Sequence, residues 1–260
     1  MNSQEIQRKH YNKIAFEYIN KRSNKTTLAY RNCLWKEFLR LIKIEINKDK
    51  NCLCLEAMCG DCEGSVRLYK MFKNFRFEAF DYSEEMVKYA KHNKIYKDGI
   101  LVIRQLDILK FNEKHKFDCV ILIGGIHHVY KNAQEVINKI NRAIKPGGIF
   151  INFEPSNNLW ILSKIREIIY NRNSVFESSS EHDFKLGDYN RMLANSGFKI
   201  IRQFYPGLLG YVLFYNPDAV PFLNMGGPKV SSLLCKIDIF LGKTFIGKYF
   251  SFNTFTIARK

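Results

Sequence analysis

The chain has 260 residues, of which 46% are hydrophobic and 25% are charged. This composition excludes an intrinsically disordered chain, and the length fits one α/β domain with additional segments better than two independent cores. The formal net charge of +16 attracts nucleic acids or anionic membranes, yet no RGG, RNP or zinc-finger pattern accompanies it, so nucleic acid is the less favoured partner.

Residues 1–48 predict an N-terminal helical lid. Apolar side chains recur at helical spacing from Gln4 to about Ile46, and a polar segment over 21–27 divides them into two amphipathic helices. The start, MNSQEIQRKHYNK, has no apolar stretch behind its basic residues, so we expect no secretory signal and a cytoplasmic protein.

Residues 49–205 alternate short apolar runs with amphipathic stretches, which indicates an α/β fold with a mostly parallel sheet covered by helices on both faces. The expected strands are CLCLEA, FRFEAFD, ILVIRQLD, FDCVILIGG, GIFINFEP and residues 198–205. Helices are expected over 64–72, 84–92, 133–144, 156–170 and 185–195, with a polar loop over 174–181.

Residues 206–250 form an expected cap insertion before the last strand, FSFNTFTIAR, which belongs to the final segment 251–260. The insertion is apolar and aromatic, but prolines interrupt it, so we expect no transmembrane helix. Two arrangements stay open. The insertion folds inward as a cap over an acceptor, or it exposes an apolar patch that contacts an anionic membrane beside Lys229, Lys236, Lys243 and Lys248.

The first strand of the sheet ends at an acid and opens through a tight turn into a helix, over LCLEAMCGDCEGS. Such a turn lets backbone N–H groups approach a nucleotide-like cofactor at the carboxyl edge of the sheet. Cys59 and Cys62 form a CxxC in this turn, but no Cys or His quartet with zinc spacing follows, so we expect no metal site.

Asp81 ends the second strand, 25 residues after Glu56. This is near the spacing of about 20 residues typical of an acid that binds the hydroxyls of a ribose. The alternative role, N-cap of the next helix, suits Ser83 better because Glu84 and Glu85 follow it in the first turn.

Five segments in this order over 51–155 resemble the class I methyltransferases that use S-adenosylmethionine (SAM). The first motif of that family is an acid followed by alternating glycines; Glu56 and Gly60 match it, whereas Met58 and Cys62 replace two of the glycines. The third strand ends in RQLDIL, and FDCVILIGGIHHV and KINRAIKPGGIFINFEP match the later motifs.

The resemblance implies a Rossmann-like sheet of seven strands, six parallel and one antiparallel, with SAM as the cofactor. DYNRMLANSGFKIIRQFYPG is similar to the late helix and antiparallel strand of the family. Asp107 and Ile108 are expected at the adenine. The cofactor-binding residues implied in the sheet region are Glu56, Ala57, Gly60, Asp81, Tyr82, Met86, Asp107, Ile108 and Gly124.

The segment RKHYNKIAFEYINKR is similar to an N-terminal helix that covers SAM in many members acting on small molecules. Aromatic residues or an arginine of that helix approach the methionine carboxylate of the cofactor. Tyr11, Tyr18 and Arg22 are the candidates here.

His127 and His128 stand at the carboxyl tip of the fourth strand, where the resemblance places the cofactor methyl, and a neutral imidazole can accept a proton near neutral pH. We favour His127 toward the acceptor as a catalytic base and His128 as a structural hydrogen-bonding residue. Glu154 and His182 are alternates, each with a solvated surface position as the more natural role.

The predicted function is transfer of a methyl group from SAM to an O, N or C nucleophile of a small molecule, such as a lipid-like compound, a sugar or an aromatic metabolite. RNA or protein methylation is an alternative prompted by the charge, although the fourth strand lacks the Asn/Asp-Pro-Pro-aromatic sequence of many nucleic acid amino-methylators. A SAM-binding protein without turnover is a third reading, supported by Met58 and Cys62. The acceptor and the oligomeric state stay open.

Overall fold

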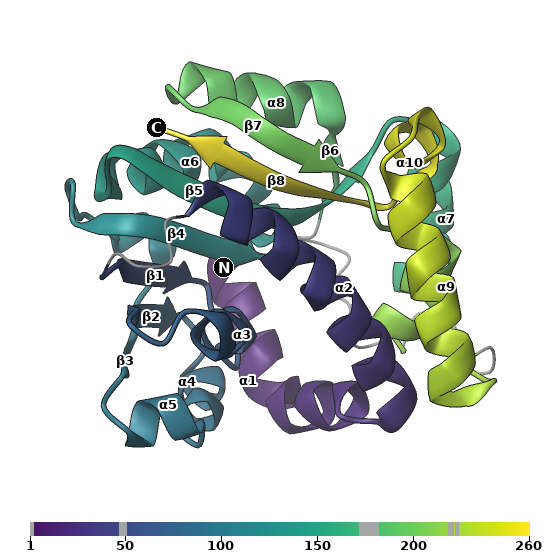
Figure 1. The fold of residues 1–260 in the computed structure, drawn as a ribbon, viewed down its shortest axis with the longest axis horizontal. Coiled ribbons are helices and arrows are strands. Elements are labelled where there is room, and N and C mark those ends of the chain that lie inside the picture. The colour runs from purple at the N-terminus through teal and green to yellow at the C-terminus, as the bar shows by residue number, and fades with distance from the viewer. Residues whose placement is uncertain (1–2, 47–50, 172–181, 218–220, 222–223) are drawn as a thin grey trace.

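The computed structural model describes residues 3–46, 51–171, 182–217, 221 and 224–260 (Figure 1). The polar loop predicted over 174–181 lies outside the described residues, and so do Asp218 and Phe222 of the expected insertion.

The described strands form one mostly parallel sheet in the order β3-β2-β1-β4-β5-β8-β7, and a short β6 pairs with the end of β5. This confirms the predicted fold class. Buried apolar runs form the central strands, as expected for a sheet covered on both faces. The strands are β1 (Leu53–Ala57), β2 (Arg76–Asp81), β3 (Leu101–Gln105), β4 (Phe117–Ile123), β5 (Ile144–Asn157), β6 (Phe184–Lys185), β7 (Lys199–Phe204) and β8 (Asn253–Arg259).

The antiparallel strand is β8, which runs opposite to both β5 and β7. The assignment of the antiparallel strand to residues 198–205 was therefore wrong: β7 is the parallel edge strand. The last segment of the chain inserts between β5 and β7, a pairing that local sequence pattern does not encode.

Helices cover both faces of the sheet, and successive residues of β1 enter opposite cores. Cys54 joins the cluster under α2 and α3, and Leu55 joins the cluster under α6 and α8. The predicted helix over 156–170 begins later, at Trp160, because β5 continues to Asn157. These helices are α3 (Glu63–Met71), α4 (Glu84–Ala90), α5 (Lys94–Lys97), α6 (Ala133–Ala143), α7 (Trp160–Asn171) and α8 (Leu186–Asn195).

The N-terminal region forms two helices, α1 (Ser3–Arg22) and α2 (Lys25–Glu45), as predicted. The Asn24 side chain caps α2 by accepting a hydrogen bond from the Thr27 backbone N–H at 2.9 Å. The two helices have different roles. Phe38 of α2 stacks on Phe255 of β8 with ring centroids 4.1 Å apart, so α2 is part of the main core, whereas α1 crosses the carboxyl ends of the strands.

The segment before β8 contains a π-helical turn η3 (Tyr211–Tyr215) and the helices α9 (Gly227–Gly242) and α10 (Phe245–Phe250). Tyr211 and Tyr215 are buried in the main core, and α9 packs along α2. Among the helices that the structure describes, none is long and apolar enough to cross a membrane.

Candidate functional site

A cavity of about 480 Å³ opens at the carboxyl ends of β1, β2 and β4, beneath α1. Its volume lies in the range of about 300–1,000 Å³ that small-molecule sites occupy. Ala57 does not line the cavity, because its side chain is buried in the core. The predicted residues that do line it are Tyr11, Tyr18, Arg22, Glu56, Gly60, Asp81, Tyr82, Met86, Asp107, Ile108, Gly124, His127 and His128.

Glu56 ties the first turn to the start of α3. Its two carboxylate oxygens accept the backbone N–H groups of Gly64 at 2.9 Å and Ser65 at 2.7 Å. A Cβ at Gly64 would lie 2.7 Å from Glu56 Oε1, so this approach requires glycine. Burial raises the pKa of Glu56 to about 7, against the opposing effect of these donors.

The turn between β1 and α3 keeps a glycine-type backbone although two glycines are missing. Met58, Gly60 and Cys62 have φ angles of 51°, 53° and 63°, so every second residue is left-handed. Non-glycine residues in this region cost on the order of 1–2 kcal/mol each, which the surrounding structure must offset. The replacements therefore change the side chains of the loop but not its course.

Asp81 faces the cavity from the tip of β2. One oxygen accepts the Gly60 N–H and the other accepts the Ser83 N–H, both at 2.8 Å. Burial raises the pKa of Asp81 above its usual range, and the backbone donors oppose that rise only in part. A carboxylate has about four lone-pair sites, so Asp81 can accept two further hydrogen bonds from a ligand. Ser83 caps α4 by accepting the Met86 N–H at 3.2 Å, as predicted.

Asp107 follows β3 at the same edge of the sheet and accepts the Leu109 N–H at 2.9 Å. This bond fixes the short turn that contains Ile108, which is buried and lines the cavity beside Asp107. Asp81 and Asp107 thus present two acids from neighbouring strands to one end of the cavity.

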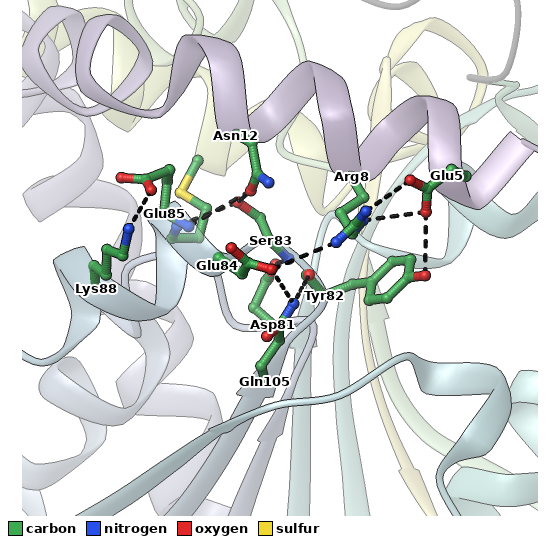
Figure 2. A network of polar contacts seen from close by, with 11 residues as sticks. Glu5, Arg8, Asn12, Asp81, Tyr82, Ser83, Glu84, Glu85, Lys88 and Gln105 are labelled. Atoms are coloured by element: carbon green, nitrogen blue, oxygen red, sulfur yellow. Dashed lines mark hydrogen bonds and ion pairs between the residues drawn. The ribbon is translucent and has the colours of Figure 1, made fainter.

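A polar clamp fastens α1 over the tip of β2 (Figure 2). Arg8 donates to Glu5 at 2.7 Å, and Glu5 accepts the Tyr82 hydroxyl at 3.3 Å. The Ser83 hydroxyl donates to Asn12 Oδ1 at 2.6 Å. Sequence reasoning missed Glu5, Arg8 and Asn12, because polar residues on an amphipathic helix look the same whether they face solvent or another element.

Tyr11, Tyr18 and Arg22 line the cavity from α1 at the positions that the resemblance indicated. The rings of Tyr11 and Tyr18 meet edge to face at 5.6 Å. The guanidinium of Arg22 lies 3.5 Å from the centroid of the Tyr18 ring and is almost fully buried. A buried cation stacked on an aromatic ring is a suitable partner for a ligand carboxylate.

His127 and Glu154 form a buried pair. His127 Nδ1 lies 2.9 Å from Glu154 Oε2, while Glu154 Oε1 accepts the N–H groups of Gly125 and Ile126 at 2.9 Å. Burial raises the pKa of Glu154, but these donors outweigh it, so the pKa lies below its usual value. An ionised Glu154 selects the tautomer with a proton on Nδ1, which leaves Nε2 as the basic nitrogen of His127.

The expected surface position of Glu154 was therefore wrong. Its side chain is 1% exposed because the partner histidine comes from a different strand tip, and strand pairing cannot be read from either segment alone. His182 is exposed, contacts Tyr130 at 5.2 Å between ring centroids, and is not among the cavity residues.

His128 packs on α1 instead. Its Nε2 lies 3.4 Å from the Tyr11 hydroxyl, and the two rings meet edge to face at 5.4 Å. His128 also contributes to the electrostatic environment of Asp81. The structural role of His128 stays a prediction.

Aromatic side chains line the cavity near His127. Phe153 of β5 meets Tyr211 and Tyr215 of η3 edge to face, with ring centroids 6.1 and 5.8 Å apart. Arg31, ion-paired with Glu63, lies 4.7 Å from the Tyr215 ring. The sequence predicted an apolar contribution from residues 206–250; Tyr211 and Tyr215 provide it, whereas Leu209 is exposed.

Comparison with known proteins gives consistent matches. A family model described as a methyltransferase domain matches residues 48–197. Over 160 residues the chain is 30% identical to a demethylmenaquinone methyltransferase of Leptospira interrogans, an alignment that spans 59% of this chain and 63% of the relative.

Two solved structures share the fold. Magnesium protoporphyrin IX methyltransferase from Synechocystis PCC 6803, with bound S-adenosylhomocysteine (SAH), has a TM-score of 0.65 at 14% identity and covers 100% of both chains. Phosphoethanolamine N-methyltransferase 2 from Haemonchus contortus, also with SAH, has a TM-score of 0.65 at 17% identity and covers 97% of this chain and 60% of its own.

Proposed function

Because the chain belongs to the methyltransferase domain family, we propose that it transfers a methyl group from SAM to a nucleophilic oxygen, nitrogen or carbon of a small molecule with an apolar part. One observation carries this proposal. A single cavity has two acids at one end, and it is also lined by a group of tyrosines and by His127, which the buried Glu154 holds from behind.

The residues of the cavity fit SAM. Asp81 has acceptor sites left for the ribose hydroxyls, and Asp107 with Ile108 is suited to the adenine. Gly60 has no heavy atom within 4 Å of where a Cβ would lie, so the cofactor can approach its backbone closely. Arg22 and Tyr18 would bind the methionine carboxylate. In this arrangement α1 is the lid over the cofactor.

SAM supplies a methyl group that is already activated by the sulfonium, so the protein has to align donor and acceptor and exclude water. The chain does this with the clamp of α1 on the tip of β2 and with η3, which closes the cavity from the opposite segment of the chain. We assign residues 206–217 to the wall of the acceptor site.

His127 is the proposed general base. Glu154 holds the Nδ1 proton, so Nε2 can take a proton from an acceptor hydroxyl, amine or acidic carbon as the methyl group is transferred. Glu154 acts through His127 and is a positioning residue. His128 supports α1 and Asp81 and takes no proton in this scheme.

The acceptor that suits the site has a ring or short chain of apolar atoms and one nucleophilic group. Phe153, Tyr211 and Tyr215 offer aromatic faces and edges to such a molecule. The relative from Leptospira interrogans is named for demethylmenaquinone and the Synechocystis structure for magnesium protoporphyrin IX, and both names support an acceptor with a large apolar part. The Haemonchus contortus structure is named for phosphoethanolamine, which is polar, so the aromatic lining of the cavity carries this assignment.

Calorimetric titration with SAM and SAH tests the cofactor. We expect one site per chain, and Asp81→Ala should weaken binding about ten- to a hundredfold because two ribose hydroxyls lose a charged acceptor. Asp98→Ala, at an exposed position outside the cavity, is the matched control and should leave affinity unchanged. No binding of SAM at millimolar concentration, or preferential binding of NAD, would contradict the proposal.

A further inference from the structure

Helix α9 exposes its apolar side. Val230, Leu233, Ile237 and Phe240 follow one another at intervals of three and four residues, which places them on one stripe of the helix, and all four are exposed. The side chain of Phe240 is the most exposed of the four, with 71% of its surface accessible. A helix that served only the core would turn this stripe inward.

The buried side of α9 is polar or small. Ser231 donates to the Thr26 carbonyl at 2.7 Å, and Asp238 accepts the Tyr30 hydroxyl at 2.6 Å. Gly242 packs against the Tyr205 carbonyl, where a Cβ would lie 2.6 Å from the oxygen. The fold therefore fixes the orientation of α9 with specific contacts, and the outward direction of the apolar stripe is built in.

Two more helices with exposed apolar side chains lie next to α9. The Asn158 side chain donates to the Lys248 carbonyl and Arg166 donates to the Phe252 carbonyl, both at 2.5 Å, so α7 lies beside α10. Gly247 of α10 packs on Gly242 of α9. Figure 1 shows the three helices together on one side of the molecule. We group the exposed apolar side chains of these three helices as the apolar face: Trp160, Ile161, Ile165, Ile168, Val230, Leu233, Ile237, Phe240, Phe245, Tyr249 and Phe250.

Lysines border the apolar face. Lys229, Lys236 and Lys243 recur every seven residues along α9 and its end, and Lys248 lies on α10; all are exposed. Lys243 forms an ion pair with Glu37 at 2.8 Å. Within α9 and α10 the one acid is Asp238, which is buried, so no acidic side chain of these two helices opposes the lysines at the surface.

We propose that the apolar face docks on the surface of a membrane that contains anionic lipids. Apolar side chains beside lysines, with tryptophan and tyrosine among them, match the boundary between acyl chains and anionic headgroups. A second copy of the chain is less suitable as the occupant, because a two-fold contact would bring the lysine rows of both copies together at its rim.

Docking does not depend on methyl transfer, so the two proposals can fail separately. The apolar face and the cavity are also connected in the structure. Tyr211 and Tyr215 of η3 line the cavity, and η3 packs against α9. Helix α9 therefore lies between its outward apolar stripe and the tyrosines that line the cavity.

Flotation of the whole protein with vesicles tests the proposal. We expect the protein to float with vesicles of phosphatidylcholine and phosphatidylglycerol and to stay behind with phosphatidylcholine alone. Phe240→Ser with Phe245→Ser should lower the partition coefficient by about ten- to a hundredfold, since each phenylalanine loses its apolar burial. Lys229→Glu with Lys236→Glu should lower it by at least about fivefold for each lysine.

Matched controls use positions away from the face. Val102→Ser alters an exposed apolar residue of β3, and Lys97→Glu with Lys199→Glu reverses two exposed charges; neither should change flotation. Circular dichroism establishes that each variant is folded. Absence of flotation with anionic vesicles at low salt would overturn the proposal. So would a dimer in analytical ultracentrifugation that Phe240→Ser dissociates while the wild-type protein ignores vesicles, since that result assigns the face to a second copy.

Discussion

At the scale of single residues, Glu154 determines what His127 can do. Glu154→Gln keeps an oxygen for the Gly125 and Ile126 N–H groups but presents an amide to His127 Nδ1. We expect turnover to fall about ten- to a thousandfold while SAM affinity stays the same, because the histidine loses its selected tautomer. Rapid-quench measurement of methyl transfer over a range of pH, with an acceptor identified, would show this loss.

The dependence of turnover on pH shows whether Glu154 acts by positioning His127 or only supports the fold. Turnover that depends on a basic His127 should rise with pH, and loss of the carboxylate should move this rise toward lower pH. His128→Ala is the companion variant and should change cofactor affinity more than the chemical step. If His127→Ala retains wild-type turnover at every pH, alignment alone accounts for catalysis.

Asp238 gives the structure a pH-dependent stability. Burial raises its pKa from 3.8 to about 6, although Tyr30 and the Tyr211 N–H donate to it. A carboxyl group whose pKa is higher in the folded state than in the unfolded state stabilises the fold at any pH below its unfolded-state pKa. That stabilisation is lost as the pH rises through the folded-state pKa. Asp238→Asn does not titrate, so its stability relative to wild type should improve on the order of 2 kcal/mol between about pH 4 and pH 7.

Urea unfolding of both proteins at several pH values measures this difference. An offset between Asp238→Asn and wild type that stays constant with pH would mean that Asp238 has the same pKa in the folded and unfolded states. The quantity to compare is how the difference in unfolding free energy between the variant and wild type changes with pH. Its absolute size is less informative, because the substitution also alters a hydrogen bond.

The positions of residues at the tips of their own strands were predicted well from the sequence. Asp81 ends β2 and Asp107 follows β3, and acids at adjacent parallel strand tips lie close together in space. Glu154 could not be assigned, because its role depends on the pairing of β4 with β5 and on a turn three residues long that brings His127 back to it.

At the scale of elements, polar contacts hold α1 closed over the cavity, and a cofactor beneath α1 would bind more tightly because of them. Arg8→Ala with Asn12→Ala removes the links to Glu5, Glu84 and Ser83. We expect SAM affinity to fall about threefold to thirtyfold, since α1 then closes at a higher conformational cost. Amide hydrogen exchange in α1 should become faster in the cofactor-free protein.

Lys13→Ala is the matched control on α1, because Lys13 is exposed and is not among the residues that line the cavity. It should change neither affinity nor exchange. Unchanged SAM binding in the double variant, together with faster exchange, would show that α1 moves independently of the cofactor.

Elements whose apolar residues face the core were predicted close to their true limits, and α9 was not predicted at all. Strands β1 to β4 have continuous apolar runs bounded by turns, which pattern alone identifies. In α9 the apolar stripe faces outward and the inward face contains Ser231, Cys235, Asp238 and Gly242, so its residues do not show the usual arrangement of a helix that packs on a core.

At the scale of the whole molecule, the cavity is assembled from segments that are far apart in the sequence. Helix α1 closes it over β2, and η3, about 190 residues later, closes it beside β5. Composition and length bounded this architecture to one α/β domain, but the joint contribution of the first and the late segments to one site required the three-dimensional structure.

Because β8 lies between β5 and β7, the sheet cannot close in the order in which a ribosome delivers its strands. Among the strands that the structure describes, β7 pairs with β8 alone. When β7 leaves the exit tunnel this partner has not yet been made, and β5 still has an open apolar edge. Both edges stay available for wrong pairing until about 50 further residues have been synthesised, a period in which nascent chains can associate. The amphipathic helices α8 and α6 beside that edge, and any chaperone that reaches it, would then govern the yield of native protein as much as the stability of the finished fold does.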